Sequence, residues 1–327
     1  MNAVQGAVQA VVAAGGDPAA RLMERLEDRL LEIANGHGPL LGRHAADTIA
    51  AGGKRLRPLL LFLAAGAPPP ESESLLRSAV AVELVHSATL VHDDVLDGSP
   101  LRRGRPTVMA AGGRLAATAT GDLLFSRAFA ELAGTGSVAA VRVLSRASSE
   151  LAAGELMQRA DAWRAVAQER YLERCRLKTG VLFRAACELG GLEGAAQGDG
   201  GLSALARFGE RIGLAFQLLD DVLDVTGPPE RTGKPLGADL LDGTVTLPLI
   251  LAREREEALA ELDLRTVRSA ERAAEVCARI AGTGALEDTR ARALDLVAGA
   301  KADLPELPER QRMALELIAD GVVERYS

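Results

Sequence analysis

The chain has 327 residues and a formal net charge of −7. Hydrophobic residues make up 48% of the chain, and aromatic residues only 3%. This hydrophobic share is ample for a packed core, and the abundance of Ala and Leu over aromatic residues favours helices over strands, so we expect an all-α protein. The negative charge gives no general electrostatic support for a nucleic-acid partner, and we expect none.

The N-terminal stretch, residues 1–17, is low in complexity and is expected to be a flexible tail, followed by a single domain over 18–327. Apolar residues at helical spacing predict helices over these stretches: 21–34, from Pro58 onward, 72–97, 113–133, 138–160, 169–189 and 202–225, with three or four more after residue 246. The glycine-rich stretch 190–201 reads as a loop, but composition does not change across it, so no domain boundary is placed there.

Cysteine usage and the termini indicate a cytoplasmic protein. Cys175, Cys187 and Cys277 are odd in number, widely spaced and embedded in helical patterns, which is typical of reduced thiols. No charged segment precedes the apolar N-terminal run, whose first basic residue is Arg21, so it does not resemble a signal peptide. No run of about 18 consecutive apolar residues occurs, so we expect no transmembrane segment.

The string DDVLD occurs twice, beginning at Asp93 and at Asp220, each time at the end of a helical pattern and just before a Gly and Pro break. Residues four apart share a helix face, so Asp93 lies beside Asp97 and Asp220 beside Asp224. The carbonyl end of a helix disfavours negative charge by about 0.3–1 kcal/mol per charge, so a cation should compensate. Clustered carboxylates with phosphates nearby suit Mg²⁺; the alternative, a solvated acidic helix end, is weakened by the repetition.

Basic residues accompany these strings. Lys54 and Arg57 lie three apart at a predicted helix start, where positive charge is unfavourable unless an anion binds there. Arg102 and Arg103 directly follow the first string and suit bidentate phosphate binding, although they could also simply neutralise the aspartates. Lys234 lies in a loop rich in Gly and Pro and is available as a further cation.

Three polar positions on the predicted helices complete the candidate site. His86 precedes Asp93 by two helical turns on the same face, although a helical His is more often a hydrogen-bonded core or surface residue. Lys178 and Thr179 lie amid apolar residues, where a Lys usually extends to the surface and a phosphate contact is the sharper alternative. Gln217 lies three residues before Asp220 and shares its face.

Together these motifs resemble the trans-prenyltransferases, the polyprenyl diphosphate synthases of isoprenoid biosynthesis. The resemblance runs in order from about Gly52 to Pro248: GGKRLRP at 52–58, HSATLVHDDVLD at 86–97, RRGRPT at 102–107, GEL with Gln158, KTG at 178–180, FQLLDDVLD at 216–224, and GKPLGADL followed by TLP. A single DDxxD string is a weak signal, whereas this ordered set is specific. It implies a single large helical bundle around a deep central cavity, and a homodimer.

The resemblance also implies a reaction and roles for the residues. Isopentenyl diphosphate condenses with an allylic diphosphate, with about two or three Mg²⁺ ions at the departing pyrophosphate. The implied metal ligands are Asp93, Asp97 and Asp220, with Asp94, Asp221 and Asp224 as direct or water-mediated partners. The implied diphosphate contacts are Arg102, Lys178 and Lys234 for the allylic substrate and Lys54, Arg57, His86 and Arg103 for isopentenyl diphosphate, with Gln217 and Thr179 positioning the reacting groups.

Product length depends on the helix face before Asp93. Ala88 and Thr89 are small, so they leave a cavity open for a long-chain product of about six or more isoprene units, which Phe125 or Phe129 would stop. Peripheral membrane contact would suit such a product. The family usually has Lys where this chain has Thr244, so one phosphate contact is replaced by a hydroxyl or lost.

Three alternatives stay open. A short-chain synthase making farnesyl or geranylgeranyl diphosphate would share every motif. A class I terpene cyclase also ionises a diphosphate, but it would not need the second basic group of Lys54, Arg57, His86 and Arg103. A subunit of a heteromeric synthase is the third, although such partners generally lack one aspartate cluster and this chain retains both.

Overall fold

A computed structural model of the chain describes residues 3–102, 104–194, 199–227 and 235–324. These residues are almost entirely helical, which confirms the predicted fold class, and two short strands pair as an antiparallel hairpin. In chain order the elements are α1 (Ala3–Gly15), α2 (Asp17–Asn35), α3 (Gly38–Ala50), α4 (Leu56–Ala65), α5 (Glu73–Asp97), β1 (Leu101–Arg102), β2 (Arg105–Pro106), α6 (Val108–Ala133), α7 (Val138–Asp161), α8 (Gln168–Cys175), the π-helical turn η1 (Arg176–Gly180), α9 (Val181–Glu193), α10 (Asp199–Thr226), α12 (Ala238–Asp242), α13 (Leu247–Arg255), α14 (Glu257–Ala260), the 3₁₀ turn η2 (Leu264–Thr266), α15 (Ala270–Ala281), α16 (Ala285–Ala302) and α17 (Glu309–Glu324).

The chain divides into two compact units, where the sequence predicted one domain. Unit 1 comprises Met1–Ser148, Leu182–Gly209 and Asp303–Gly321, and unit 2 comprises Ser149–Val181, Glu210–Ala302 and Val322–Ser327. Four of the boundaries fall inside helices: α7, α9, α10 and α17. Because a boundary inside a helix needs neither a linker nor a change of composition, the sequence carries no signal for it.

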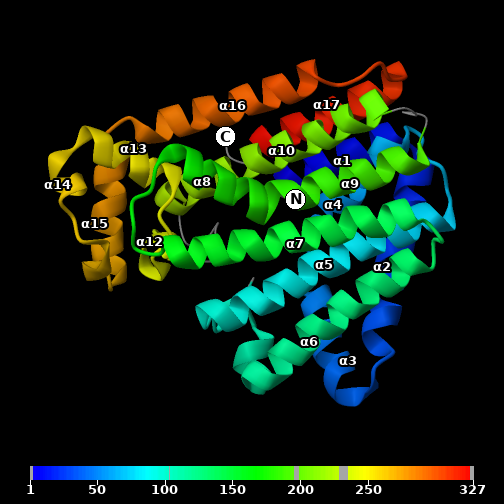
Figure 1. Ribbon diagram of the computed structural model, residues 1–327, viewed down its shortest axis with the longest axis horizontal. Helices are drawn as coiled ribbons and strands as arrows, with labels where there is room; N and C mark the ends of the chain where they lie inside the picture. The colour runs from blue at the N-terminus through cyan, green and yellow to red at the C-terminus, as the bar shows by residue number, and fades with distance from the viewer. Residues whose placement is uncertain (1–2, 103, 195–198, 228–234, 325–327) are drawn as a thin grey trace. The chain divides into compact units, whose positions relative to one another are not determined.

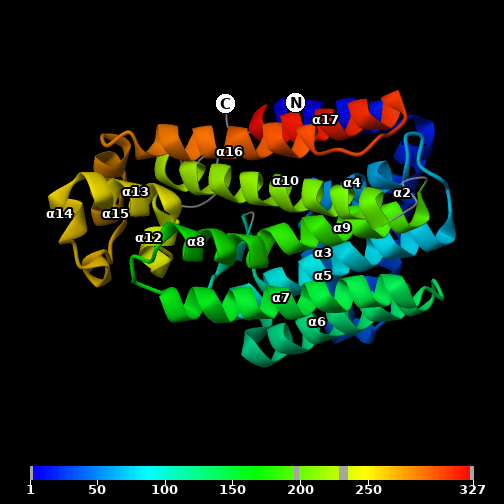
Figure 2. The same cartoon turned by 45° about the horizontal axis from the view of Figure 1, so that its top comes forward.

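Helix α5 lies in the core of unit 1. Its N-cap Ser72 accepts a hydrogen bond from the backbone N–H of Leu75 (3.0 Å), and Gly98 ends it in the left-handed conformation (φ 64°). It packs against α2, α4 and α6, and α5 and α6 lie side by side in both ribbon views (Figures 1 and 2). Among the described residues it is also the helix long and apolar enough to cross a membrane, but 72% of that stretch is buried inside the protein, as in a core helix.

Helix α1 (Ala3–Gly15) occupies most of the stretch that the sequence predicted as a flexible tail. Val11 is 3% exposed, and α1 packs against α2 and α4 within unit 1. The guanidinium of Arg310 donates through Nε to the backbone oxygen of Ala14 (3.0 Å), which also holds the end of α1. Ala and Val at helical spacing suffice to pack this helix on its neighbours.

In unit 2, the C-terminal helices build a core around α13. It packs against α8, α14, α15 and α16, and Figure 1 shows α13, α14 and α15 grouped together. The sequence predicted three or four helices after residue 246, and the described residues there form five α-helices, α13 to α17, of which α14 is only four residues long. The helix predicted over 169–189 is instead divided into α8, η1 and α9, and this division matters for the site below.

The cysteines are structural. Cys175, Cys187 and Cys277 are all buried and none forms a disulfide, which confirms the prediction of reduced thiols. Burial raises the pKa of the Cys175 and Cys187 thiols well above the ordinary value, so neither is a reactive thiolate.

Candidate active site

The first DDVLD string occupies the last turns of α5, as predicted, and its aspartates differ in exposure. Asp97 is exposed and Asp93 half-buried, whereas Asp94 is 4% exposed. One oxygen of Asp94 accepts hydrogen bonds from both Nε and Nη2 of Arg102 in the hairpin, each at 2.8 Å. The middle aspartate therefore anchors the hairpin to the helix end, and Asp97 is the most exposed of the three.

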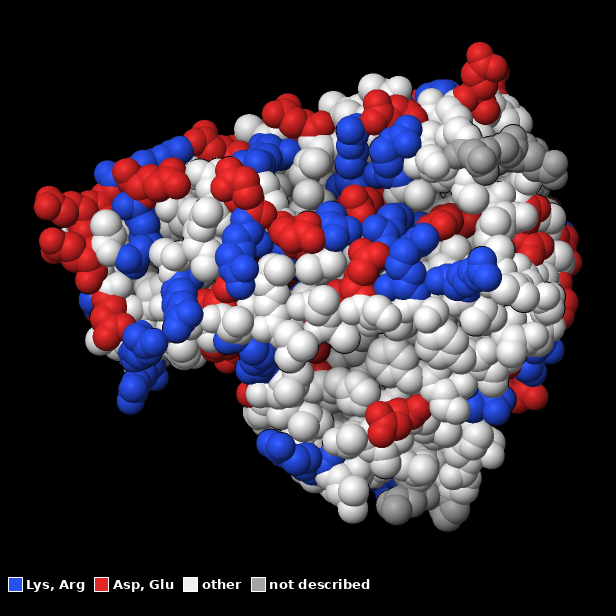
Figure 3. All heavy atoms as spheres, viewed as in Figure 1, with Lys and Arg blue, Asp and Glu red and all other residues white. Residues whose placement is uncertain are grey.

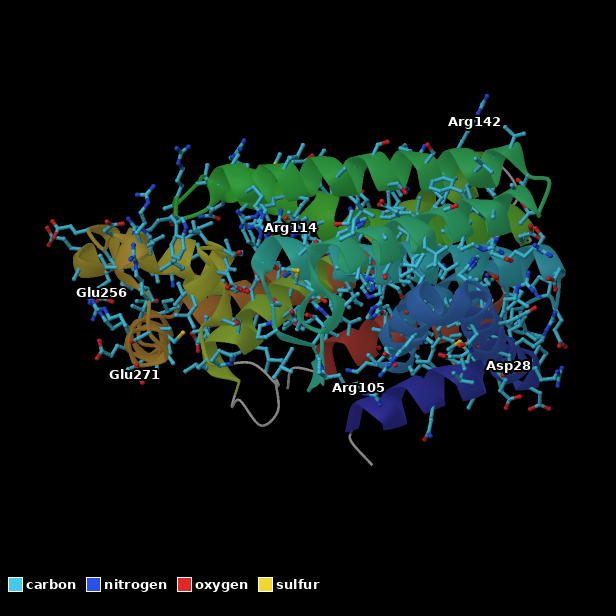
Figure 4. All side chains as sticks on the ribbon, turned by 90° about the horizontal axis from the view of Figure 1, so that it is seen from below. Asp28, Arg105, Arg114, Arg142, Glu256 and Glu271 are labelled. Atoms are coloured by element: carbon cyan, nitrogen blue, oxygen red, sulfur yellow. The ribbon has the colours of Figure 1, made fainter. Side chains whose placement is uncertain are left out.

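The basic segment that follows this string contains Arg102, which pairs with an aspartate of the string instead of standing ready for phosphate. It forms the hairpin of β1 and β2, with Arg105 exposed on β2 (Figure 4), and Arg102 pairs with Asp94. This is the mutual neutralisation that the sequence left open as an alternative to phosphate binding. Arg103 lies outside the described residues, and so does Lys234.

The GGKRLRP segment leads into α4 in unit 1. Lys54 and Arg57, the predicted diphosphate contacts, are half-buried, and the guanidinium of Arg57 lies over the ring of Phe183 at 4.6 Å from its centroid. His86 is half-buried on α5, which packs against α4. The three residues thus come from adjoining elements of one unit.

Between the two predicted cations lies Arg55, a residue that sequence reasoning did not select. It adopts the left-handed conformation (φ 48°) at the N-cap of α4 and is 6% exposed. Its guanidinium donates to Glu83 on α5 (2.6 Å), to both oxygens of Glu27 on α2 (2.7 and 3.1 Å) and to the backbone oxygen of Ile49 (3.0 Å). Burial lowers the pKa of Arg55, but the bonds and charges of Glu27 and Glu83 outweigh this and raise it, so the cation is locked in place.

The predicted chain-length residues lie on α5 and α6, which pack side by side. Ala88 is fully buried, and Thr89 is half-buried with its hydroxyl donating to the backbone oxygen of His86 (2.8 Å). Phe125 and Phe129 are half-buried on α6, and the Phe125 ring stacks on His92 of α5, with 5.8 Å between ring centroids. Side chains at these positions therefore contribute to one helix–helix interface.

In unit 2, the second string ends α10, again as predicted. Asp220 is exposed, and Asp224 is half-buried and accepts from the backbone N–H of Asp239 (3.3 Å). The middle aspartate, Asp221, is again buried, at 2% exposure. It accepts one hydrogen bond from the hydroxyl of Tyr171 and another from the side-chain amide of Gln217 (2.8 Å).

The environment of Asp221 disfavours its charge. Burial raises the pKa of its carboxyl well above the ordinary value and nearby Asp239 adds to the rise, while the hydrogen bonds from Tyr171 and Gln217 oppose it. Asp239 was not among the site residues that the sequence predicted. The available signal was an acidic residue in the first turn after Gly237, fifteen residues beyond Asp224.

The KTG motif lies in the π-helical turn η1, between α8 and α9, rather than in a continuous helix. Nζ of Lys178 lies 2.5 Å from a carboxylate oxygen of Glu155 on α7, and the hydroxyl of Thr179 donates to the side-chain oxygen of Gln217 (2.8 Å). A π-turn changes the direction of the side chains that follow it and recurs at functional sites. The structure thus brings together Lys178, Thr179 and Gln217, three of the predicted residues.

Gly154 explains the GEL motif of α7. A Cβ atom at this position would lie 2.8 Å from Cβ of Leu177 and 3.0 Å from Cγ of Lys178. Only glycine lets α7 approach η1 this closely, and the next residue of α7, Glu155, then reaches Lys178.

No group of three or more His, Cys, Asp or Glu side chains among the described residues forms a ready-made metal site. The chemistry of the donors nevertheless fits Mg²⁺: each helix end presents carboxylates four residues apart, and exposed Asp97 and Asp220 offer the oxygen ligands that this ion prefers. Asp94 and Asp221, by contrast, already accept hydrogen bonds from protein side chains.

A surface groove in unit 1 contains none of the predicted site residues. It has a volume of about 430 Å³ and is lined by Arg146, Arg184, Glu188, Leu202, Ser203, Ala206 and Arg207. Arg146 and Glu188 pair across it.

Comparison with known proteins agrees with the motifs. Residues 39–281 match the model of the polyprenyl synthetase family. The chain is 42% identical over 247 residues to heptaprenyl diphosphate synthase component 2 of Geobacillus stearothermophilus, covering 75% of this chain and 76% of the relative. It is 37% identical over 289 residues to geranylgeranyl diphosphate synthase of Methanosarcina mazei, covering 85% and 87%.

A solved structure extends the likeness to the fold. The crystal structure of polyprenyl synthase from Caulobacter crescentus, complexed with calcium and isoprenyl diphosphate, superimposes with a TM-score of 0.86 at 36% identity and covers 98% of each chain. The family match, these identities and the shared fold agree with the two aspartate strings and the motifs between them. This chain belongs to the polyprenyl synthetase family.

Proposed function

We propose that the chain is a long-chain polyprenyl diphosphate synthase that condenses isopentenyl diphosphate with an allylic diphosphate primer. The observation that carries the proposal is the pair of DDVLD strings, each placed at a helix end with Asp97 or Asp220 exposed. Family membership and the crystallised relative with calcium and isoprenyl diphosphate support it.

The reaction balances without a redox partner. The bond from C1 to oxygen in the allylic diphosphate breaks, and its electron pair leaves with pyrophosphate. The double-bond electrons of isopentenyl diphosphate then form the new carbon–carbon bond, and the lost proton passes to the released pyrophosphate as base. Each cycle lengthens the allylic chain by one isoprene unit.

Each residue has a role that suits its surroundings. Lys178 would hold the allylic diphosphate, with Gln217 and Thr179 beside it, and Lys54, Arg57 and His86 would hold isopentenyl diphosphate. Arg102, Arg103 and Lys234 complete the predicted cations; Arg102 would do so while bound to Asp94. Fixed cations stabilise the departing pyrophosphate without reorganisation.

Asp93, Asp97, Asp220 and Asp224 would hold Mg²⁺, whose contribution when bound is Lewis-acid stabilisation of the pyrophosphate charge. Asp94 and Asp221 were predicted as direct or water-mediated ligands. Because both are buried and hydrogen-bonded to protein side chains, Asp94 and Asp221 would have a structural role instead.

A long product is favoured by the small side chain of Ala88 on the buried face of α5 and by the heptaprenyl relative. The geranylgeranyl relative keeps a short-chain synthase as the second candidate. A cation site for a second diphosphate, at Lys54 and Arg57, argues against a terpene cyclase.

One experiment tests activity, primer choice and product length together. The purified chain is incubated with Mg²⁺, isopentenyl diphosphate and allylic primers of increasing length, and the dephosphorylated products are weighed by mass spectrometry. We expect products of about six or more isoprene units, and shorter ones from Ala88→Phe, because the ring would fill the space that a chain needs. Unshortened products from this variant would contradict the assignment of Ala88.

The same experiment separates the alternatives. A cyclic hydrocarbon from the allylic primer alone would identify a cyclase, and products of three or four units would identify a short-chain synthase. The Geobacillus relative is named as a component, so activity of the single purified chain excludes the need for a different subunit, and inactivity of the well-folded chain supports it.

We further propose a cytoplasmic homodimer. The exposed positions of α6 carry only two charged residues, Arg114 and Asp122, among small and apolar ones such as Leu115, which is 84% exposed. Figure 3 shows few charges over α6, in contrast to the many over other parts of the surface, and a second copy of the chain would cover this face. Peripheral membrane contact would serve release of a long product.

A further inference from the structure

Asp221 lies in a closed arrangement of side chains in unit 2. It is 2% exposed, and Tyr171, which is 1% exposed on α8, donates its hydroxyl to Oδ2. Oδ1 accepts from Nε2 of Gln217 (2.8 Å). Both carboxylate oxygens therefore have protein donors, and almost none of the carboxylate surface is exposed for a metal ion.

Gln217 is held at both ends of its amide. Its oxygen accepts from the hydroxyl of Thr179 (2.8 Å), and its nitrogen donates to Asp221. The two ends of the amide have different partners: the nitrogen donates to Oδ1 of Asp221, and the oxygen accepts from Thr179. The contact with Asp221 thus helps to fix which way the amide points. Among the described residues, the bonds to Asp221 and Thr179 use one N–H and one oxygen lone pair of Gln217, which leaves one of each for another partner.

Tyr171 holds Asp221 in turn. The two residues lie fifty positions apart in sequence. Because the phenol is buried, its hydroxyl needs a buried hydrogen-bond acceptor, and Asp221 is that acceptor. The hydrogen-bonded series therefore runs from Tyr171 through Asp221 and Gln217 to Thr179, which adjoins Lys178 in η1.

We propose that Tyr171 and Asp221 are positioning residues that orient the Gln217 amide toward the allylic diphosphate, and that Asp221 is not a metal ligand. The inference rests on the proposed function, since it names how one of the substrate-contacting side chains of that site is set. Preorganised polar groups stabilise a transition state only if their orientation is fixed before reaction.

Tyr171→Phe tests the proposal, because it removes one hydroxyl and keeps the ring. We expect kcat to fall about five- to tenfold, the effect of one lost hydrogen bond in an aligned site, while KM for isopentenyl diphosphate changes by less than about twofold. In a Gln217→Ala background the same substitution should change kcat by less than about twofold, because its target is gone. An unchanged kcat in the wild-type background, or equal losses in the two backgrounds, would overturn the proposal.

Dependence on Mg²⁺ distinguishes positioning from metal binding. Asp221→Asn should lower kcat but leave the Mg²⁺ concentration for half-maximal rate within about twofold of wild type, whereas Asp220→Asn should raise it about tenfold or more. If Asp221→Asn raises the Mg²⁺ requirement as much as Asp220→Asn does, Asp221 is a ligand and the proposal is wrong.

Thr289→Val is the matched control for loss of a buried hydroxyl. Thr289 is fully buried in α16 of the same unit and donates to the backbone oxygen of Ala285 (2.8 Å). It should lower the melting temperature as Tyr171→Phe does and leave kcat unchanged. If Thr289→Val lowers kcat equally, the loss in Tyr171→Phe reflects stability alone and the proposal fails.

A measurement independent of turnover separates this inference from the proposed function. The side-chain amide protons of Gln217, assigned by their absence in Gln217→Ala, should exchange slowly with solvent in the wild-type chain and at least about tenfold faster in Tyr171→Phe. Equal exchange rates would refute the orientation by Tyr171 even in an active enzyme. Slow exchange in a chain without prenyltransferase activity would refute the proposed function alone.

Discussion

At the scale of single residues, Arg55 shows how the fold prepares a diphosphate site. The neighbouring Lys54 and Arg57 are the predicted contacts, and the segment that carries them, the end of the preceding loop and the first turn of α4, is held by Arg55. The left-handed backbone conformation of Arg55 is costly, and its buried charge is costly unless it is fully paired. The guanidinium meets Glu27, Glu83 and the backbone of Ile49 at once, which the compact ammonium of a lysine cannot do.

Arg55→Lys should therefore destabilise the protein by about 1–3 kcal/mol and raise KM for isopentenyl diphosphate about tenfold, because the fork of hydrogen bonds is lost and the loop is released. Thermal unfolding and steady-state kinetics measure both effects. Arg43→Lys is the control. Arg43 is exposed and makes a loose ion pair with Asp47 at 4.0 Å, so this substitution should change neither the stability nor KM. A wild-type KM in Arg55→Lys would show that the loop does not depend on this anchor.

At the scale of elements, the π-turn η1 decides where the KTG motif points. The sequence predicts one amphipathic helix over this stretch, because apolar periodicity continues through it, and a single extra residue in a turn leaves almost no trace in such a pattern. Gly154 was visible in the GEL motif, but its reason lies in the 2.8 Å approach to Leu177, which no spacing in the sequence reveals.

Gly154→Ala should push α7 away from η1 and lower kcat/KM for the allylic substrate about ten- to a hundredfold, because Lys178 and Thr179 would be displaced together. Gly200→Ala is the control: a Cβ there would meet nothing within 4 Å at the exposed start of α10. Kinetics with a fixed concentration of isopentenyl diphosphate measure the effect. Wild-type kcat/KM in Gly154→Ala would mean that the contact tolerates a methyl group.

At the scale of the whole molecule, the uncharged face of α6 leads to a prediction about assembly. Leu115→Glu places a charge in the proposed dimer interface, where burying it without a partner is costly, so the mass in solution should fall from that of a dimer to that of a monomer. Light scattering coupled to size exclusion measures this mass. Leu294→Glu, at a 47% exposed leucine of α16, should leave the mass unchanged, and a dimeric Leu115→Glu would place the interface elsewhere.

The sequence by itself determined the helical class, the ends of α5 and α10, the repeated carboxylates on them and the family, since caps, glycines and periodic apolar residues act locally. It did not reveal α1, the two compact units or η1. Only the tertiary structure decided which aspartate of each DDVLD string is buried. Successive helix residues point about 100° apart, and the inward direction depends on distant partners. Arg102 holds Asp94 and Tyr171 holds Asp221, and neither pairing is encoded in the string itself.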